Sequence, residues 1–155
     1  MANESVVVER RIEAPAEEVW RAMTDLEGIP RMLSGVDKVE VLSEGPFGVG
    51  TRWRETRRML GKQATEEMYV TASKPPLTYV VEADSHGTHY VSEFVLQADG
   101  PGATVAQMTF SATPPPGGAA GLLARIFGGL GARAVSKAIA KDLADVAAAV
   151  ERKTM

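Results

Sequence analysis

Residues 77–113 read LTYVVEADSHGTHYVSEFVLQADGPGATVAQMTFSAT, and this stretch decides the fold. It holds three segments rich in Val, Thr, Tyr and Phe, separated by the turn-forming runs Ser-His-Gly and Asp-Gly-Pro-Gly: 77–84, 88–98 and 103–113. Connections this short are typical of antiparallel neighbours that follow one another along a sheet. The stretch therefore predicts three consecutive strands of an antiparallel meander.

The residues before this stretch extend the sheet and add two short helices. Strand-like composition and turn signals predict further strands over residues 6–12, 36–43, 50–60 and 64–73. Pro15 fits the first position of a helix that places Val19, Trp20 and Met23 on one face. Thr24 and Glu27 have the capping-box spacing of a second short helix, which carries Leu26, Ile29, Met32 and Leu33 and which Pro30 keeps short.

The C-terminal third is predicted to be helical. The Pro/Gly run at 114–118 ends the sheet, and the Ala-rich chain then continues to Lys153 without proline. A single buried stripe is predicted at helical spacing, formed by Val135, Ile139, Leu143, Val146 and Val150.

Before this stripe begins, the apolar residues lie on a different side of the predicted helix. Projected backwards, the stripe falls on Arg125, and the change of side coincides with Gly128, Gly129 and Gly131, so a kink is predicted there. We hypothesise that 119–131 form a lid hinged at these glycines, and that it closes one mouth of a cavity with Leu123, Phe127 and Leu130. The alternatives are a segment packed on the body of the protein or a helix on a membrane surface.

Composition narrows the function classes. The 155 residues suffice for one domain spanning 1–155, and the absence of Cys excludes disulfides and thiolate metal sites. A net charge of −3 provides no overall field to attract nucleic acid or an anionic membrane. No apolar run is long enough for a membrane span, and the first residues lack a signal-peptide pattern, so a cytoplasmic location without stable membrane insertion is expected.

The order of these elements, with Ala14-Pro15-Ala16-Glu17-Glu18-Val19-Trp20, resembles the START-like (SRPBCC) superfamily of polyketide cyclases, Bet v 1-like proteins and lipid carriers. The likeness continues through Thr24-Asp25-Leu26, residues 36–42 and Phe47-Gly48-Val49-Gly50-Thr51-Arg52-Trp53, and is greatest to the polyketide cyclase/dehydrase-like branch. The resemblance implies an α+β helix-grip fold: a seven-stranded curved antiparallel sheet, with two short helices after strand 1, wrapped around a long C-terminal helix. These motifs specify a fold, and they carry little information about a reaction.

The resemblance also implies a cavity between the concave face of the sheet and the last helix. Alternation along the strands then predicts which side chains line it. Together with the three lid residues, the expected ligand-binding residues are Trp53, Glu55, Met68, Tyr79, Tyr90, Phe94, Met108 and Phe110. For the strands at 64–73 and 77–84 the alternation allows either face, and the inward assignment of Met68 and Tyr79 is the preferred one.

Three residues are candidates for chemistry. Glu55 could act as a general base in an aldol cyclisation or dehydration, Arg57 could orient a ligand carboxylate or phenolate, and Tyr90 could handle a proton. The simpler interpretation is that Glu55 pairs with Arg57 on the same face.

Two other groups of residues favour structural interpretations. His86 and His89 straddle a turn and have no carboxylate beside them in sequence to complete a metal set, so no metal or cofactor is expected, and His89 is assigned to the solvated face. Arg52, Arg54 and Arg58 alternate outward, where Glu66, Glu67 and Glu82 can offset them, which argues against a nucleic-acid platform.

The leading hypothesis is therefore a protein that binds a small hydrophobic or aromatic molecule, such as a lipid, an isoprenoid or a polyketide-like compound. The second is a cyclase, aromatase or dehydratase acting on a β-keto chain. The third is a partner-binding module that uses the lid segment or the convex face of the sheet. The ligand, the occurrence of catalysis and the oligomeric state do not follow from the sequence.

Overall fold

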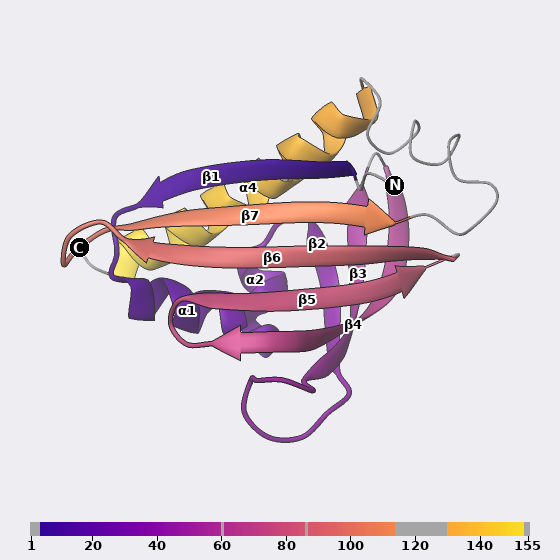
Figure 1. Ribbon diagram of the computed structural model, residues 1–155, viewed down its shortest axis with the longest axis horizontal. Helices are drawn as coiled ribbons and strands as arrows, with labels where there is room; N and C mark the ends of the chain where they lie inside the picture. The colour runs from indigo at the N-terminus through magenta and orange to yellow at the C-terminus, as the bar shows by residue number, and fades with distance from the viewer. Residues whose placement is uncertain (1–3, 60, 86, 114–129, 154–155) are drawn as a thin grey trace.

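The computed structural model describes residues 4–59, 61–85, 87–113 and 130–153 (Figure 1). Within them, seven strands form one antiparallel sheet in the order β1-β7-β6-β5-β4-β3-β2. The strands are β1 (Glu4–Ile12), β2 (Val36–Val41), β3 (Arg52–Met59), β4 (Lys62–Lys74), β5 (Thr78–Ser85), β6 (Thr88–Ala98) and β7 (Thr104–Thr113). The predicted meander is confirmed, and β1 pairs with β7, the last strand of the meander.

The helices lie where the sequence predicts them, with different boundaries. They are α1 (Ala16–Thr24), the 3₁₀-helix η1 (Leu26–Gly28), α2 (Ile29–Met32) and the long α4 (Leu130–Lys153). Pro15 is the N-cap residue before α1 and not its first residue, because its backbone is extended (φ −62°, ψ 152°), although its carbonyl accepts the backbone N–H of Val19. The capping box is wrong: the Thr24 hydroxyl donates to the Trp20 carbonyl, 2.8 Å away, and no side chain caps η1.

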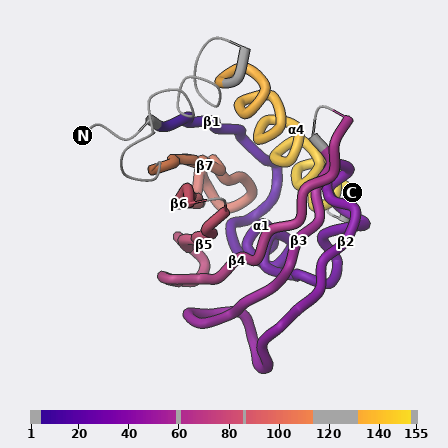
Figure 2. The backbone as a smooth tube through the Cα atoms, turned by 90° about the vertical axis from the view of Figure 1, so that its right-hand side faces the viewer, coloured from indigo at the N-terminus to yellow at the C-terminus, as the bar shows by residue number. Residues whose placement is uncertain are grey.

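The sheet is curved into a cup, and α4 lies along its open side (Figure 2). In this view α4 runs between β1 on one side and β2 and β3 on the other. The predicted apolar stripe faces inward: Ile139, Leu143, Val146 and Val150 are buried, and Val135 packs against the core at its edge. The fold is therefore the helix-grip arrangement, with the helix held against the concave face.

Register decides which side chains enter the cup. On β3 and β4, Trp53 lies opposite Met68, and Glu55 lies opposite Glu66, so each pair shares a face. A bulge between Val70 and Ala72 shifts the pairing of β4 with β5. This irregularity is the physical reason why simple alternation leaves the inward face of these two strands ambiguous.

Strand ends differ from the prediction by at most two residues, and β6 matches it at both ends. β2 ends at Val41 and not at residue 43, and a register shift between Val36 and Lys38 interrupts its pairing with β3. β4 runs from Lys62 to Lys74, beyond the predicted 64–73. Turn composition places a turn better than it places the last paired residue of a strand.

The lid hypothesis concerns a part of the chain that lies outside the described residues. Leu123, Phe127, Gly128, Gly129 and the side chain of Leu130 fall there, whereas Gly131 lies in the first turn of α4, so the lid and its hinge remain a prediction. Among the described residues, no helix has the length and apolar character needed to cross a membrane.

Candidate functional site

A cavity of about 480 Å³ lies between the concave face of the sheet, the short helices and α4. Every strand from β3 to β7 contributes side chains to it, together with α1, η1, α2 and the inner side of α4. Its described lining includes Met23, Leu26, Ile29, Met32, Phe47, Trp53, Glu55, Arg57, Glu66, Met68, Tyr79, Val81, Tyr90, Ser92, Phe94, Met108, Phe110, Val135, Ile139, Asp142, Leu143 and Val146. Most of this surface is apolar, and the few polar groups belong to β3, β4, β5, β6 and α4.

The inward orientation predicted for the cavity side chains is confirmed. The eight strand residues expected there all line the cavity, and so does Arg57. Tyr79 and Trp53 are buried, with only 4% of each residue exposed. Whether these residues contact a ligand stays a prediction.

Aromatic rings form two groups in the wall of the cavity. Tyr79 stacks on Phe94 with ring centroids 4.4 Å apart, and Trp20 and Phe47 meet Tyr79 edge to face at 5.2 Å. Further along the cavity, Tyr90 stacks on Phe110 at 5.6 Å. Parallel stacked pairs leave flat ring faces beside the cavity, which suits a planar or apolar guest.

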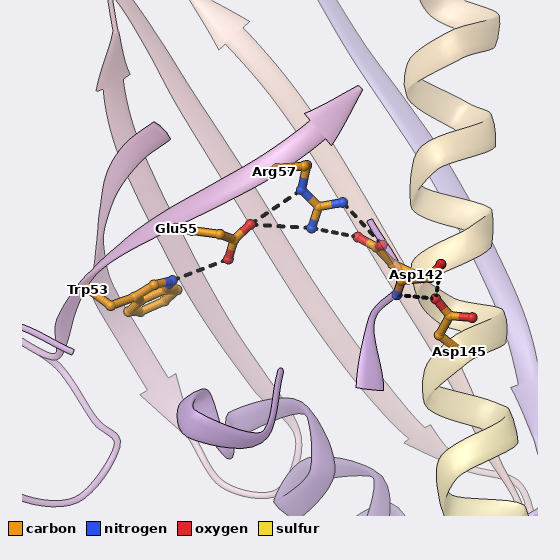
Figure 3. A network of polar contacts seen from close by, with 6 residues as sticks. Trp53, Glu55, Arg57, Asp142 and Asp145 are labelled. Atoms are coloured by element: carbon orange, nitrogen blue, oxygen red, sulfur yellow. Dashed lines mark hydrogen bonds and ion pairs between the residues drawn. The ribbon is translucent and has the colours of Figure 1, made fainter. Parts of the chain in front are cut away.

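The polar end of the cavity is a chain of hydrogen bonds that joins β3 to α4 (Figure 3). Trp53 Nε1 donates to Glu55 Oε1 at 3.3 Å, and Arg57 Nε and Nη2 both donate to Glu55 Oε2 at 3.3 Å. On its other side, Arg57 forms a fork with Asp142, with Nη1 3.1 Å from Oδ1 and Nη2 3.0 Å from Oδ2. The simpler interpretation of Glu55, a carboxylate paired with Arg57, is confirmed.

Burial and charge shift the ionisation of this network. Burial lowers the pKa of Arg57, but the carboxylates of Asp142 and Glu55 outweigh it and hold that pKa above its ordinary value. Burial raises the pKa of Asp142, and the attraction of Arg57 only partly offsets this. Burial, followed by the charge of Glu55, raises the pKa of Tyr79 far above the physiological range, so its hydroxyl stays protonated.

Gly35 provides the space that the fork between Arg57 and Asp142 occupies. A Cβ atom at this position would lie 3.3 Å from Arg57 Nη1 and 3.9 Å from Asp142 Oδ1. The carbonyl of Gly35 also accepts the backbone N–H of Arg58 at 3.0 Å. Next to it, Ser34 donates its backbone N–H and its hydroxyl to Asp145, which ties this loop to α4.

Sequence reasoning missed Asp142 and misplaced Glu66. Asp142 follows the buried Ile139 by three positions and precedes Val146 by four, so its place on the inner face of α4 could have been found from helical spacing. Glu66 lines the cavity and does not balance the outer arginines, because it is adjacent to the outward-facing Glu67 and lies opposite Glu55. Neighbouring residues on a strand point to opposite faces.

The outer face of β3 carries simple ion pairs. Arg52 pairs with Glu67, Arg54 with Glu40 and Arg58 with Asp37. Glu82, expected to help balance these arginines, instead accepts a hydrogen bond from His89. Each outer arginine is therefore matched by a single carboxylate, two of which come from β2.

His89 also lies away from the cavity, but it is not simply solvated. Its Nδ1 lies 2.6 Å from Asp84 and its Nε2 lies 2.6 Å from Glu82, and these two carboxylates raise its pKa. His86 lies outside the described residues. Among the residues that the structure describes, no group of three or more His, Asp or Glu side chains could hold a metal ion.

Comparison with known proteins agrees with this architecture. A family model described as polyketide cyclase/dehydrase and lipid transport matches residues 3–151. No curated protein matches the chain.

Three similar solved structures illustrate the fold. TTHA0849 from Thermus thermophilus is 23% identical with a TM-score of 0.79, and the match covers 98% of this chain and 100% of that one. The Zhui aromatase/cyclase from Streptomyces sp. R1128 is 21% identical with a TM-score of 0.80, covering 99% and 97%. A norcoclaurine synthase point mutant from Thalictrum flavum is 15% identical with a TM-score of 0.75, covering 100% and 99%. At these identities the likeness concerns the fold alone.

Proposed function

Because the chain belongs to the polyketide cyclase/dehydrase and lipid transport family, we propose that it binds a small apolar or aromatic molecule in the cavity between the sheet and α4. The observation that carries the proposal is the cavity itself: about 480 Å³, walled by apolar and aromatic side chains with a single polar end. This is the usual composition of small-molecule sites.

The energetics support binding without chemistry. Burying about 300 Å² of apolar ligand surface contributes roughly 7 kcal/mol, provided that little ordering is needed on binding. The aromatic side chains are already ordered before a ligand binds, because the ring of Tyr79 contacts the rings of both Phe94 and Trp20. A guest therefore enters a site whose side chains are already placed.

The test is native mass spectrometry of the purified protein, followed by organic extraction of whatever accompanies it. We expect a stoichiometric apolar adduct in the wild-type protein. Ser92→Phe, which fills the cavity from β6, should lose it, whereas Val91→Phe, which places the same final side chain on the other face of β6, should retain it. A bare protein mass, with no thermal shift across fatty alcohols, isoprenoids and aromatic polyketide-like compounds, would overturn the proposal.

A cyclase or dehydratase is the second candidate, and the buried network is the observation that favours it. Glu55 is 7% exposed and lies in the cavity wall, where a general base would be needed, and Arg57 holds its carboxylate in place. Glu55→Gln separates the two functions once a ligand is known. An enzyme should lose turnover while keeping affinity, whereas a carrier should lose little affinity and show no turnover at all.

A further inference from the structure

The charges at the polar end of the cavity bear on which ligand it accepts, given the proposed binding function. Three carboxylates line this end, those of Glu55, Glu66 and Asp142. Among the described lining residues, Arg57 is the only cation. The carboxylate of Glu82, whose residue also borders the cavity, is engaged by His89. Arg57 is shared between Glu55 and Asp142, so among the described residues Glu66 is the carboxylate of this end that has no cationic partner.

Arg57 has little left to offer an incoming anion. Its Nε, Nη1 and Nη2 atoms are all engaged by Glu55 and Asp142, at 3.0–3.3 Å. A ligand carboxylate would have to displace one of these partners and leave it buried without its counter-charge. Arg57 is therefore a structural cation and does not orient a carboxylate, contrary to the role considered from its sequence position.

The environment of Glu66 also favours a positively charged ligand group. It stands directly opposite Glu55 across β3 and β4, and like charges in this arrangement destabilise a sheet. Within the described residues Glu66 has neither an ion-pair partner nor a hydrogen-bond partner for its side chain. Burial, followed by the charge of Glu66, raises the pKa of Tyr90. A positive group placed between Glu55 and Glu66 would relieve this repulsion.

We propose that the cavity selects ligands in which an apolar or aromatic skeleton carries a protonated amine, and that it rejects the carboxylate of the same skeleton. The skeleton packs against the aromatic walls. The ammonium group supplies to Glu55 and Glu66 the positive charge that the protein lacks at this end. A free fatty acid, which meets the apolar requirement, fails the charge requirement.

The test compares three ligands that share one ring system: 2-naphthylmethylamine, 2-naphthylmethanol and 2-naphthoate. Affinities are measured by isothermal titration calorimetry at about pH 7.5, where the amine is protonated and the acid is ionised, and at an ionic strength of about 0.15 M. We expect the amine to bind at least about tenfold tighter than the carboxylate, with the alcohol between them. Equal or tighter binding of the carboxylate would overturn the selectivity while leaving the binding function in place.

Two charge-matched variants locate the effect. Glu66→Gln should reduce the ratio of amine to carboxylate affinity by roughly threefold or more, since it removes the carboxylate that has no cationic partner among the described residues. Glu93→Gln removes the same charge from the exposed face of β6 and should leave the ratio unchanged. Equal changes in both variants would mean that net charge, and not this end of the cavity, sets the preference. If no ligand of the series binds and the purified protein carries no adduct, the proposed function fails together with the selectivity.

Discussion

The two faces of β3 carry the same kinds of side chain in two different environments. On the outer face, Arg52, Arg54 and Arg58 are 45–63% exposed and pair with single carboxylates in solvent. On the inner face, Arg57 is 27% exposed and pairs with two carboxylates, one of which, Glu55, is only 8% exposed. Alternate residues of one strand thus sample water on one side and the wall of a cavity on the other.

The difference shows how burial changes the value of an ion pair. Exposed pairs are screened by water and salt, so each contributes little to stability. Buried charges lose their hydration, and removing one partner leaves the other without compensation in a poorly solvated place. The outer arginines can therefore be exchanged at small cost, whereas Arg57 is tied both to the fold and to the cavity.

The largest expected effect on stability comes from removing the arginine on the inner face of β3. Arg57→Met should lower the free energy of unfolding by about 3 kcal/mol, because Glu55 and Asp142 lose their shared cation. Arg54→Met, the matched change on the outer face, should lower it by about 0.5 kcal/mol or less. Urea denaturation of both variants measures the two values. Similar losses in the two variants would show that burial does not separate the faces.

A smaller effect is expected from crowding the inner network without removing a charge. Gly35→Ala places a Cβ atom 3.3 Å from Arg57 Nη1 and should lower the free energy of unfolding by about 1 kcal/mol. Adding Arg57→Met completes a double-mutant cycle. In the Arg57→Met background, the loss of unfolding free energy caused by Gly35→Ala should be smaller by at least about 0.5 kcal/mol than in the wild type. Strict additivity in urea denaturation would show that Gly35 acts independently of Arg57.

The smallest effect belongs to an outer-face cluster and depends on pH. The carboxylates of Asp84 and Glu82 raise the pKa of His89 above 6.5, so the stability they contribute is present below about pH 6.5 and is lost as pH rises through the raised value. The pKa of Glu82 is lowered by the Thr71 hydroxyl and His89, and that of Asp84 by His89 and Tyr69, so the contribution also weakens in strong acid.

The free energy of unfolding of the wild-type protein should therefore exceed that of His89→Gln by about 0.5 kcal/mol near pH 6. This difference should disappear near pH 9. Paired thermal denaturation curves at the two pH values measure it. A gap that widens toward pH 9 would reverse the assigned sign of the linkage.

The fold could be predicted from the sequence because its signals are local. Turn-forming runs such as Asp99-Gly100-Pro101-Gly102 separate the strands, and the spacing of Ile139, Leu143 and Val146 predicts a helix with one buried face. These features depend on a few neighbouring residues. The capping box failed even though its cause is local, because the Thr24 hydroxyl bonds back to the Trp20 carbonyl four residues earlier instead of forward to the next turn.

The site was predicted only where alternation alone decides the outcome. Trp53, Glu55, Tyr90 and Phe94 follow from strand parity and do line the cavity. The pairing of Arg57 with Asp142 depends on how α4 rotates over the sheet, and the position of Glu66 opposite Glu55 depends on the register between β3 and β4. Rotation and register are set by the whole packing arrangement and leave no mark in a short stretch of sequence.

The fork between Arg57 and Asp142 joins residues that are 85 positions apart in the chain. One belongs to the sheet and the other to the helix, and replacing Arg57 alone leaves both Asp142 and Glu55 without their shared cation. Across the evolutionary history of related chains, changes at the two positions are expected to have occurred together. A related protein whose cavity accepts a different ligand at its polar end would carry substitutions at both positions, in two distant parts of its gene.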